Sequence, residues 1–133
     1  MTVKVCLGGT FNVLHEGHEA LIRRACKEGE GIFIGLTSDA MAADSRHVKV
    51  APYATRMRNL AEAVERICPD KDFDIREIND PMGPAATGDF DVIVVSEETV
   101  PGAERINKAR AMAGLRPMRI SVVEMVRGRD GER

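Results

Sequence analysis

Short apolar runs, each followed by glycine, proline or polar residues, recur along the whole chain. Residues 92–95 form the most continuous run, whereas residues 73–78 alternate between apolar and polar positions. Runs of this length and composition are typical of strands, and the continuous ones of strands that are buried on both faces. The pattern predicts strands at residues 3–7, 32–36, 73–78, 92–95 and 118–126.

Three longer stretches between these runs repeat their apolar residues at helical spacing. The first starts near His18 and ends at Gly29, while Pro52 and Pro101 suit the first turns of the second and third. Residues 37–51 show no clean period, so we expect a loop that can include a helical turn. The faces predicted to point inward consist of Leu21, Ile22, Ala25 and Cys26 in the first helix, of Met57, Leu60, Ala61, Val64 and Ile67 in the second, and of Ile106, Ala109, Met112 and Ala113 in the third.

The resulting order, β-α-β-α-β-β-α-β, predicts an α/β fold. Because the strands are too apolar for a half-exposed sheet, we expect a Rossmann-like, doubly wound parallel five-stranded sheet with helices on both faces. The length fits one domain over residues 1–133. Ligands of such sheets bind beyond the carboxyl ends of the strands, so the loops after Leu7, Leu36, Ile78 and Val95 should meet at the site.

Composition narrows the range of functions. A formal net charge of -2 argues against a protein that coats nucleic acid, and no apolar run approaches a membrane span or a signal segment. Cys6, Cys26 and Cys68 form no CxxC pair and no cluster with zinc-ligand spacing. We therefore expect three core thiols in a reducing, cytoplasmic environment, with neither nucleic acid nor membrane as a partner.

The most informative stretch is Gly8-Gly9-Thr10-Phe11-Asn12-Val13-Leu14-His15-Glu16-Gly17-His18. It follows a buried strand and opens a helix, where a phosphate-binding loop belongs. The two glycines let the backbone approach a ligand, and the free N–H groups of the helix favour an anion. Thr10 adds a hydroxyl donor, and His15 and His18 are spaced so that both rings can face one phosphate chain.

This set of donors suits attack by a phosphate oxygen on the α-phosphorus of a nucleotide. Such a step needs positioning and donors directed at the transferring group, and no covalent intermediate. A dinucleotide fingerprint and a P-loop are both absent from the sequence. His15 and His18 could instead ligate zinc, although no third ligand is evident, or could be structural or surface residues.

Gly9-Thr10-Phe11 with His15-Glu16-Gly17-His18 resembles the signature of the cytidylyltransferase-like nucleotidyltransferases, with Asn12 where most members have Asp. The rest of the chain is similar to the archaeal and eukaryotic phosphopantetheine adenylyltransferases. The segments that carry this likeness are Thr37-Ser38-Asp39, Lys49-Val50-Ala51-Pro52-Tyr53 with Arg56, Asp80-Pro81-Met82-Gly83-Pro84-Ala85, Val94-Val95-Ser96-Glu97-Glu98-Thr99, Asn107 and Gly114-Leu115.

The resemblance implies transfer of AMP from ATP, with Mg²⁺, to 4′-phosphopantetheine, which gives dephospho-CoA and pyrophosphate in coenzyme A biosynthesis. ATP, 4′-phosphopantetheine and dephospho-CoA or CoA are the implied partners, and the oligomeric state stays open. The resemblance assigns catalysis to His18 and Lys49, and contact with the acceptor to Thr10 and Lys49. The implied ATP-binding residues are Gly9, Thr10, Phe11, His15, His18, Glu97, Glu98, Thr99 and Asn107.

Simpler roles stay open for several of these residues. Lys49 could belong to a solvated loop, and Glu97 and Glu98 could be carboxylates that complement a helix N-terminus. Arg56 and Arg58 are expected on the solvent face of their helix.

The family also carries a Ser/Thr-Arg phosphate-binding segment after its last strand, and we expect this chain to lack it, which would weaken its binding of ATP. The alternatives are a sibling adenylyl- or cytidylyltransferase, such as an FMN adenylyltransferase, or a nucleotide-binding module that is inactive without that segment.

Overall fold

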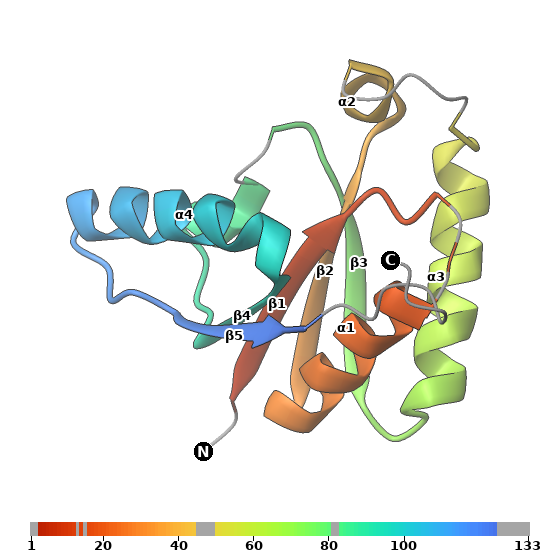
Figure 1. Cartoon of the computed structure of the whole chain (residues 1–133), viewed down its shortest axis with the longest axis horizontal. Helices are drawn as coiled ribbons and strands as arrows, with labels where there is room; N and C mark the ends of the chain where they lie inside the picture. Colours follow the sequence, from red (N-terminus) through yellow and green to blue (C-terminus); the bar gives the residue numbers. More distant parts are fainter. Residues whose placement is uncertain (1–2, 13, 15, 45–49, 81–82, 125–133) are drawn as a thin grey trace.

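All five predicted strands are present and form one parallel sheet. The computed structural model describes residues 3–12, 14, 16–44, 50–80 and 83–124. The strand order is β3-β2-β1-β4-β5 (Figure 1), which confirms the doubly wound α/β fold. The strands are β1 (Lys4–Gly9), β2 (Gly31–Thr37), β3 (Asp72–Ile78), β4 (Val92–Ser96) and β5 (Arg119–Val123).

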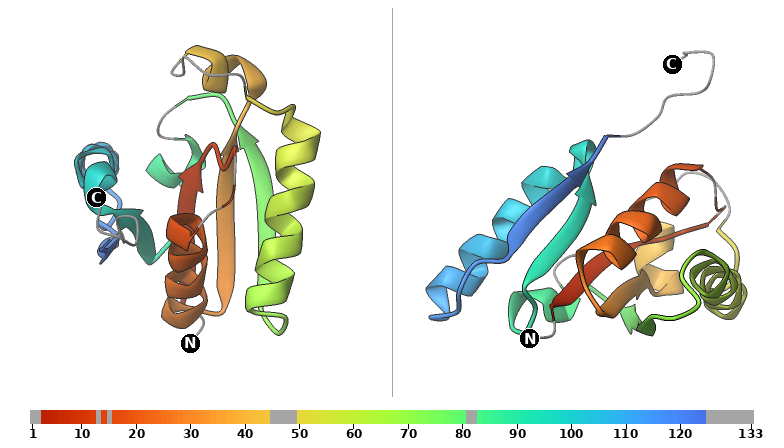
Figure 2. Two further views of the ribbon diagram at one scale, coloured as in Figure 1. Left: turned by 45° about the vertical axis from the view of Figure 1, so that its right-hand side comes forward. Right: turned by 90° about the horizontal axis from the view of Figure 1, so that it is seen from below.

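Helices cover both faces of this sheet. Helices α1 (Glu16–Glu28) and α3 (Tyr53–Ile67) pack on one face, and α4 (Val100–Met112) packs on the other (Figure 2). The short helix α2 (Asp39–Asp44) lies in the stretch that was expected to be a loop with a helical turn. Two 3₁₀ turns, η1 (Gly83–Ala86) and η2 (Glu97–Thr99), flank β4. Within the described residues, no helix is both long enough and apolar enough to cross a membrane.

The alternation of side chains along the strands divides the interior into two cores. In β1, Val5 and Leu7 pack with α1 and α3, whereas Cys6 points to the α4 face. In β4, Val92 and Val94 belong to the first core, and Ile93 and Val95 to the second. Both faces of these strands are therefore buried, which explains why their sequences read as continuous apolar runs.

The central strand β1 and its neighbour β4 form the point at which the winding of the sheet reverses. From β1 the chain proceeds to β2 on one side, and from β4 it proceeds to β5 on the other. The loops that leave these neighbouring strands therefore diverge and open a space above their carboxyl ends. Gly29 closes α1 at the opposite end, where a Cβ would lie 2.5 Å from the Val3 carbonyl oxygen.

The predicted inward faces of the second and third helices need correction. In α3 the buried positions are Arg56, Leu60, Ala63 and Val64, so the first inward residue is an arginine and Met57 is turned toward solvent. In α4 the side chain of Met112 is 83% exposed. The last turn of α4 extends past the strands (Figure 1), so its apolar residue has no sheet to cover.

The prediction of three thiols is wrong for two of the cysteines. Cys26 of α1 and Cys68, the residue that follows α3, form a disulfide, and only Cys6 is a free thiol. Their Cα atoms lie 6.4 Å apart because α1 and α3 pack side by side. A separation of 42 residues in sequence gave no sign of this proximity. The cysteines therefore no longer argue for a reducing compartment.

Reduction of the disulfide should destabilise the protein without changing its fold. Cross-linking a loop of this length typically contributes about 2–4 kcal/mol, and we expect that loss in the free energy of unfolding when urea titrations are repeated with a reductant. A Cys26→Ser/Cys68→Ser variant should be insensitive to the reductant. Alkylation of the urea-unfolded, unreduced chain should label Cys6 alone; labelling of all three cysteines would contradict the disulfide.

Candidate active site

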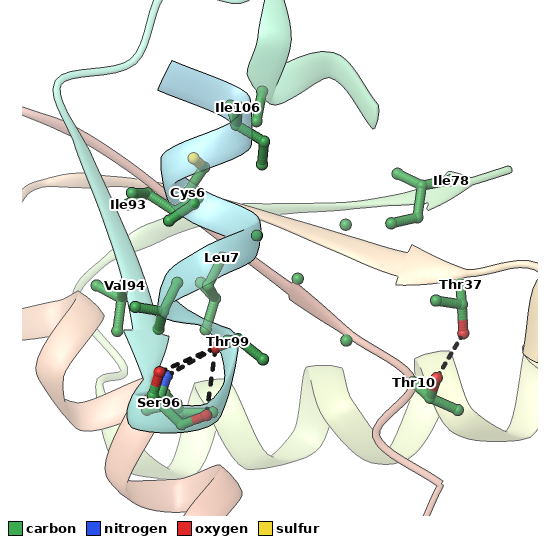
Figure 3. A pocket seen from close by; sticks show the side chains of 18 of the residues that line it. Cys6, Leu7, Thr10, Thr37, Ile78, Ile93, Val94, Ser96, Thr99 and Ile106 are labelled. Atoms are coloured by element: carbon green, nitrogen blue, oxygen red, sulfur yellow. Dashed lines mark hydrogen bonds between the residues drawn. The ribbon is translucent and has the colours of Figure 1, made fainter. Parts of the chain in front are cut away.

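A cavity of about 760 Å³ opens where the winding reverses. Its walls are the loop after β1, the end of β2, η1, and the turn that leads from β4 into α4 (Figure 3). All four strand ends that the sequence predicted to meet here contribute residues, including Ile78 at the end of β3. The prediction that these strand ends meet is therefore confirmed, and they meet at this cavity.

Phe11 fixes the shape of the glycine loop. Its backbone adopts the left-handed region, with φ of 48°, and its side chain is only 2% exposed. A Cβ on Gly9 would lie 3.1 Å from the Phe11 ring, so glycine allows the ring to fold back over the loop. The ring centroid lies 5.0 Å from that of His18 in the first turn of α1. A strained backbone held by a buried ring thus positions Thr10 and His18 at the cavity wall.

Arg56, which was expected on the surface, is fully buried and forms hydrogen bonds to the glycine loop from helix α3. Its Nη1 donates to the carbonyl oxygens of Thr10 (3.1 Å) and Thr37 (2.9 Å). Its Nε donates to the carbonyl oxygen of Ala51 (2.7 Å), and its Nη2 to the carboxylate of Asp39 (2.8 Å). One guanidinium therefore connects the glycine loop, the end of β2, the start of α2 and the segment before α3.

Asn12 completes this anchoring. Its Oδ1 accepts a hydrogen bond from the backbone N–H of Ala51 at 2.8 Å. Ala51 is thus held through both its N–H and its carbonyl group, by Asn12 and Arg56 respectively. The contact requires only a side-chain oxygen, which an aspartate would supply equally, so the departure from the family signature at this position preserves this hydrogen bond.

The opposite wall of the cavity is formed by the turn after β4. Thr99 Oγ1 accepts from the Ser96 N–H at 3.0 Å and donates to the Ser96 carbonyl at 3.1 Å. This exchange closes η2, and α4 follows with Pro101 in its first turn. Figure 3 shows the Ser96–Thr99 pair on one side of the cavity and the Thr10–Thr37 pair on the other.

The floor between these two walls is apolar. It includes Cys6, Ile93 and Ile106, which all belong to the core beneath α4. Burial raises the pKa of the Cys6 thiol to about 12, and the charge of Arg110 opposes the rise only in part. The thiol is therefore protonated at neutral pH and serves as an apolar lining group. Polar donors at the rims and an uncharged floor suit a ligand with phosphates and a less polar portion.

The family of the chain follows from its relatives. The cytidylyltransferase-like family model matches residues 6–130. A phosphopantetheine adenylyltransferase of Pyrobaculum aerophilum is 44% identical over 92% of this chain and 80% of its own length. Another, from Methanosarcina mazei, is 41% identical over 96% and 84%. The chain belongs to the phosphopantetheine adenylyltransferase family, among the cytidylyltransferase-like proteins.

A solved structure extends this agreement from sequence to fold. A protein of unknown function from Archaeoglobus fulgidus superimposes with a TM-score of 0.84 at 42% identity, over 91% of this chain and 89% of that one. Pantothenate synthetase of Thermus thermophilus shares the fold at 14% identity, with a TM-score of 0.60.

Most residues that the adenylyltransferase resemblance pointed to are brought together by the fold. The cavity is lined by Gly9, Thr10, Phe11, His18, Glu97, Glu98 and Thr99. Asn107, which was predicted to bind ATP, is not among the lining residues. Its side-chain amide accepts a hydrogen bond from the Met118 N–H (2.8 Å) and donates one to the Met118 carbonyl oxygen (2.9 Å), so it joins α4 to the segment before β5. His15 and Lys49 lie outside the described residues, so their roles stay predictions.

Two residues of the site were not recognised as such from the sequence. Thr37 and Arg56 stand in segments that resemble the family, yet no role was assigned to either. The available signal was the position of Arg56, four residues before the buried Leu60 and therefore on the same face of α3.

Replacement of Arg56 by lysine should destabilise the fold strongly. An ammonium group cannot reach all of these acceptors from one point, and each buried carbonyl that loses its donor costs about 1–3 kcal/mol, so we expect a loss of about 2–4 kcal/mol. Urea unfolding measures it. Arg58→Lys is the matched control: this side chain is exposed on the same helix and should change stability by less than about 0.5 kcal/mol. Equal stability of the two variants would contradict the anchoring role.

Proposed function

We propose that this protein transfers AMP from ATP to 4′-phosphopantetheine and releases pyrophosphate. A phosphate oxygen of the acceptor attacks the α-phosphorus of ATP, a new P–O bond forms, and the bond from the α-phosphorus to the bridging oxygen of the leaving pyrophosphate breaks. The products are dephospho-CoA and pyrophosphate. Because the attacking phosphate is already ionised, no general base is required, and catalysis consists of alignment and stabilisation of charge.

The observation that carries this proposal is the combination of family membership and cavity. Relatives that are 39–44% identical over nearly the whole chain bear the name phosphopantetheine adenylyltransferase. Thr10 and His18, to which the resemblance assigns contact with the reacting phosphates, both line this cavity. That cavity is large enough for a nucleotide and part of an acceptor.

The two walls suggest how the substrates divide the site. Thr10 and His18, on the glycine-loop side, would hold the reacting phosphates, with the His18 imidazole stabilising charge on the transferring group. The backbone of the turn at Glu97, Glu98 and Thr99 would receive the adenosine of ATP. Lys49, as the bridge between donor and acceptor phosphates, and His15, as a contact to the triphosphate, complete the proposal from the resemblance alone.

Mg²⁺ enters this proposal as part of the substrate MgATP. Among the described residues, no group of three His, Cys, Asp or Glu side chains is placed to hold a metal ion. Mg²⁺ commonly keeps several waters and binds mainly through substrate phosphates, so a protein cage is not needed for this role. The proposal includes a cytoplasmic location, because the reaction draws on the ATP of that compartment.

Acceptor-dependent release of pyrophosphate tests the proposed reaction directly. The protein is incubated with MgATP, with and without 4′-phosphopantetheine, and pyrophosphate and dephospho-CoA are both quantified. His18→Ala should lower kcat about 10²–10³-fold, because it removes one preorganised donor to the transition state.

Lys27→Ala, an exposed position on the same helix, is the control and should retain full activity. FMN and glycerol 3-phosphate (the latter with CTP) are offered as rival acceptors. Turnover with either rival and none with 4′-phosphopantetheine would refute the proposal.

A further inference from the structure

A chain of hydrogen bonds leads from the buried guanidinium of Arg56 to the wall of the cavity. Arg56 Nη1 donates to Thr37 Oγ1 at 3.3 Å, and Thr37 Oγ1 donates to Thr10 Oγ1 at 3.0 Å. Thr37 and Thr10 are buried, come from different strand ends, and both line the cavity. The link between the two hydroxyl groups is drawn in Figure 3.

Both hydrogen bonds of this chain point from Arg56 toward the cavity. A guanidinium can only donate, so the Thr37 oxygen accepts from Arg56, and the Thr37 hydroxyl donates its own hydrogen to Thr10 Oγ1. The Thr10 oxygen then accepts, and its single hydrogen is directed away from Thr37. Because Thr10 lines the cavity, that hydrogen is available to an acceptor on a ligand.

We propose that Arg56 and Thr37 are positioning residues that orient the Thr10 hydroxyl as a donor toward the substrate phosphates. This inference rests on the proposed function. Arg56 reaches the substrate through two hydroxyl groups and touches no substrate itself. Consecutive hydrogen bonds polarise one another, so a cation at the start of the chain makes the terminal hydroxyl a stronger donor to an anion. The hydroxyl is also preorganised, because it need not turn from another partner when charge develops.

Thr37 is the residue at which this role can be separated from the structural one. Thr37→Val keeps the β-branched shape and removes only the hydroxyl. Arg56 Nη1 retains two acceptors for its two N–H groups, namely the carbonyl oxygens of Thr10 and Thr37. The anchoring of the loop is therefore preserved in this variant, whereas any substitution of Arg56 removes anchoring and orientation together.

The test compares Thr37→Val and Thr37→Ser with the wild type in the full chain, alone and combined with Thr10→Val. Pyrophosphate release with MgATP and 4′-phosphopantetheine gives kcat and KM, and urea unfolding confirms that each variant is folded. We expect Thr37→Val to lower kcat about tenfold and to raise the KM for ATP by a smaller factor, about threefold, because the oriented donor acts mainly in the transition state and to a lesser extent on the bound phosphates. Thr37→Ser keeps the link and should stay within about twofold of the wild type.

The combined variants decide whether Thr37 acts through Thr10. In the Thr10→Val background, Thr37→Val should cause no further loss, since the two residues belong to one chain. Wild-type kcat in Thr37→Val, an equal loss in the Thr10→Val background, or a failure of serine to restore activity would each overturn the inference.

Failure of the proposed function would look different, because the wild type itself would then release no pyrophosphate. In that case the same variants are compared by calorimetry with ATP as the ligand. Weaker ATP binding by Thr37→Val, restored by Thr37→Ser, would support the orienting role, and unchanged binding would overturn it.

Discussion

The site depends on one buried guanidinium. Arg56 lies at 0% exposure within an apolar layer, where an unpaired charge would be very costly. Its donors instead meet carbonyl oxygens and the carboxylate of Asp39, whose side chain remains 64% exposed. Only arginine offers donors that fan out in a plane to acceptors on several sides. Helix α3 covers the sheet and, through Arg56, also holds the glycine loop in place.

This support matters because the proposed chemistry needs fixed donors more than reactive groups. A loop that carried Thr10 and His18 on a flexible backbone would have to order itself in every catalytic cycle. The buried side chain of Phe11, whose backbone is left-handed, fixes the conformation of the loop, and Arg56 holds the loop through a hydrogen bond to the Thr10 carbonyl oxygen. The ordering is thus complete when the protein folds, and the donors meet the developing charge without rearrangement.

The sequence contained most of the fold and the position of the site, because both depend on local patterns. Apolar runs marked the strands, and the glycine loop between a strand and a helix marked one wall of the cavity. The order of the strands within the sheet did not follow from these patterns, since pairing is not encoded in periodicity. The errors concern contacts between distant segments: the disulfide of Cys26 with Cys68, the exposed Met112, and Arg56. A charged residue is normally expected to face solvent. The burial of Arg56 could not be predicted without its partners, three of which lie in other segments of the chain.

A second buried arginine shows what is particular about the first. Arg110 of α4 donates from Nη1 to the carbonyl oxygens of Ala85 and Gly88, and from Nε to that of Arg116. It holds η1, which also lines the cavity, on the opposite face of the sheet from Arg56. These contacts of Arg110 end on backbone carbonyls. Arg56 makes the same kind of contact and also pairs with the carboxylate of Asp39, but in addition it donates to the Thr37 hydroxyl, which leads to the cavity. This last link joins the stability of the fold to the proposed chemistry of the site.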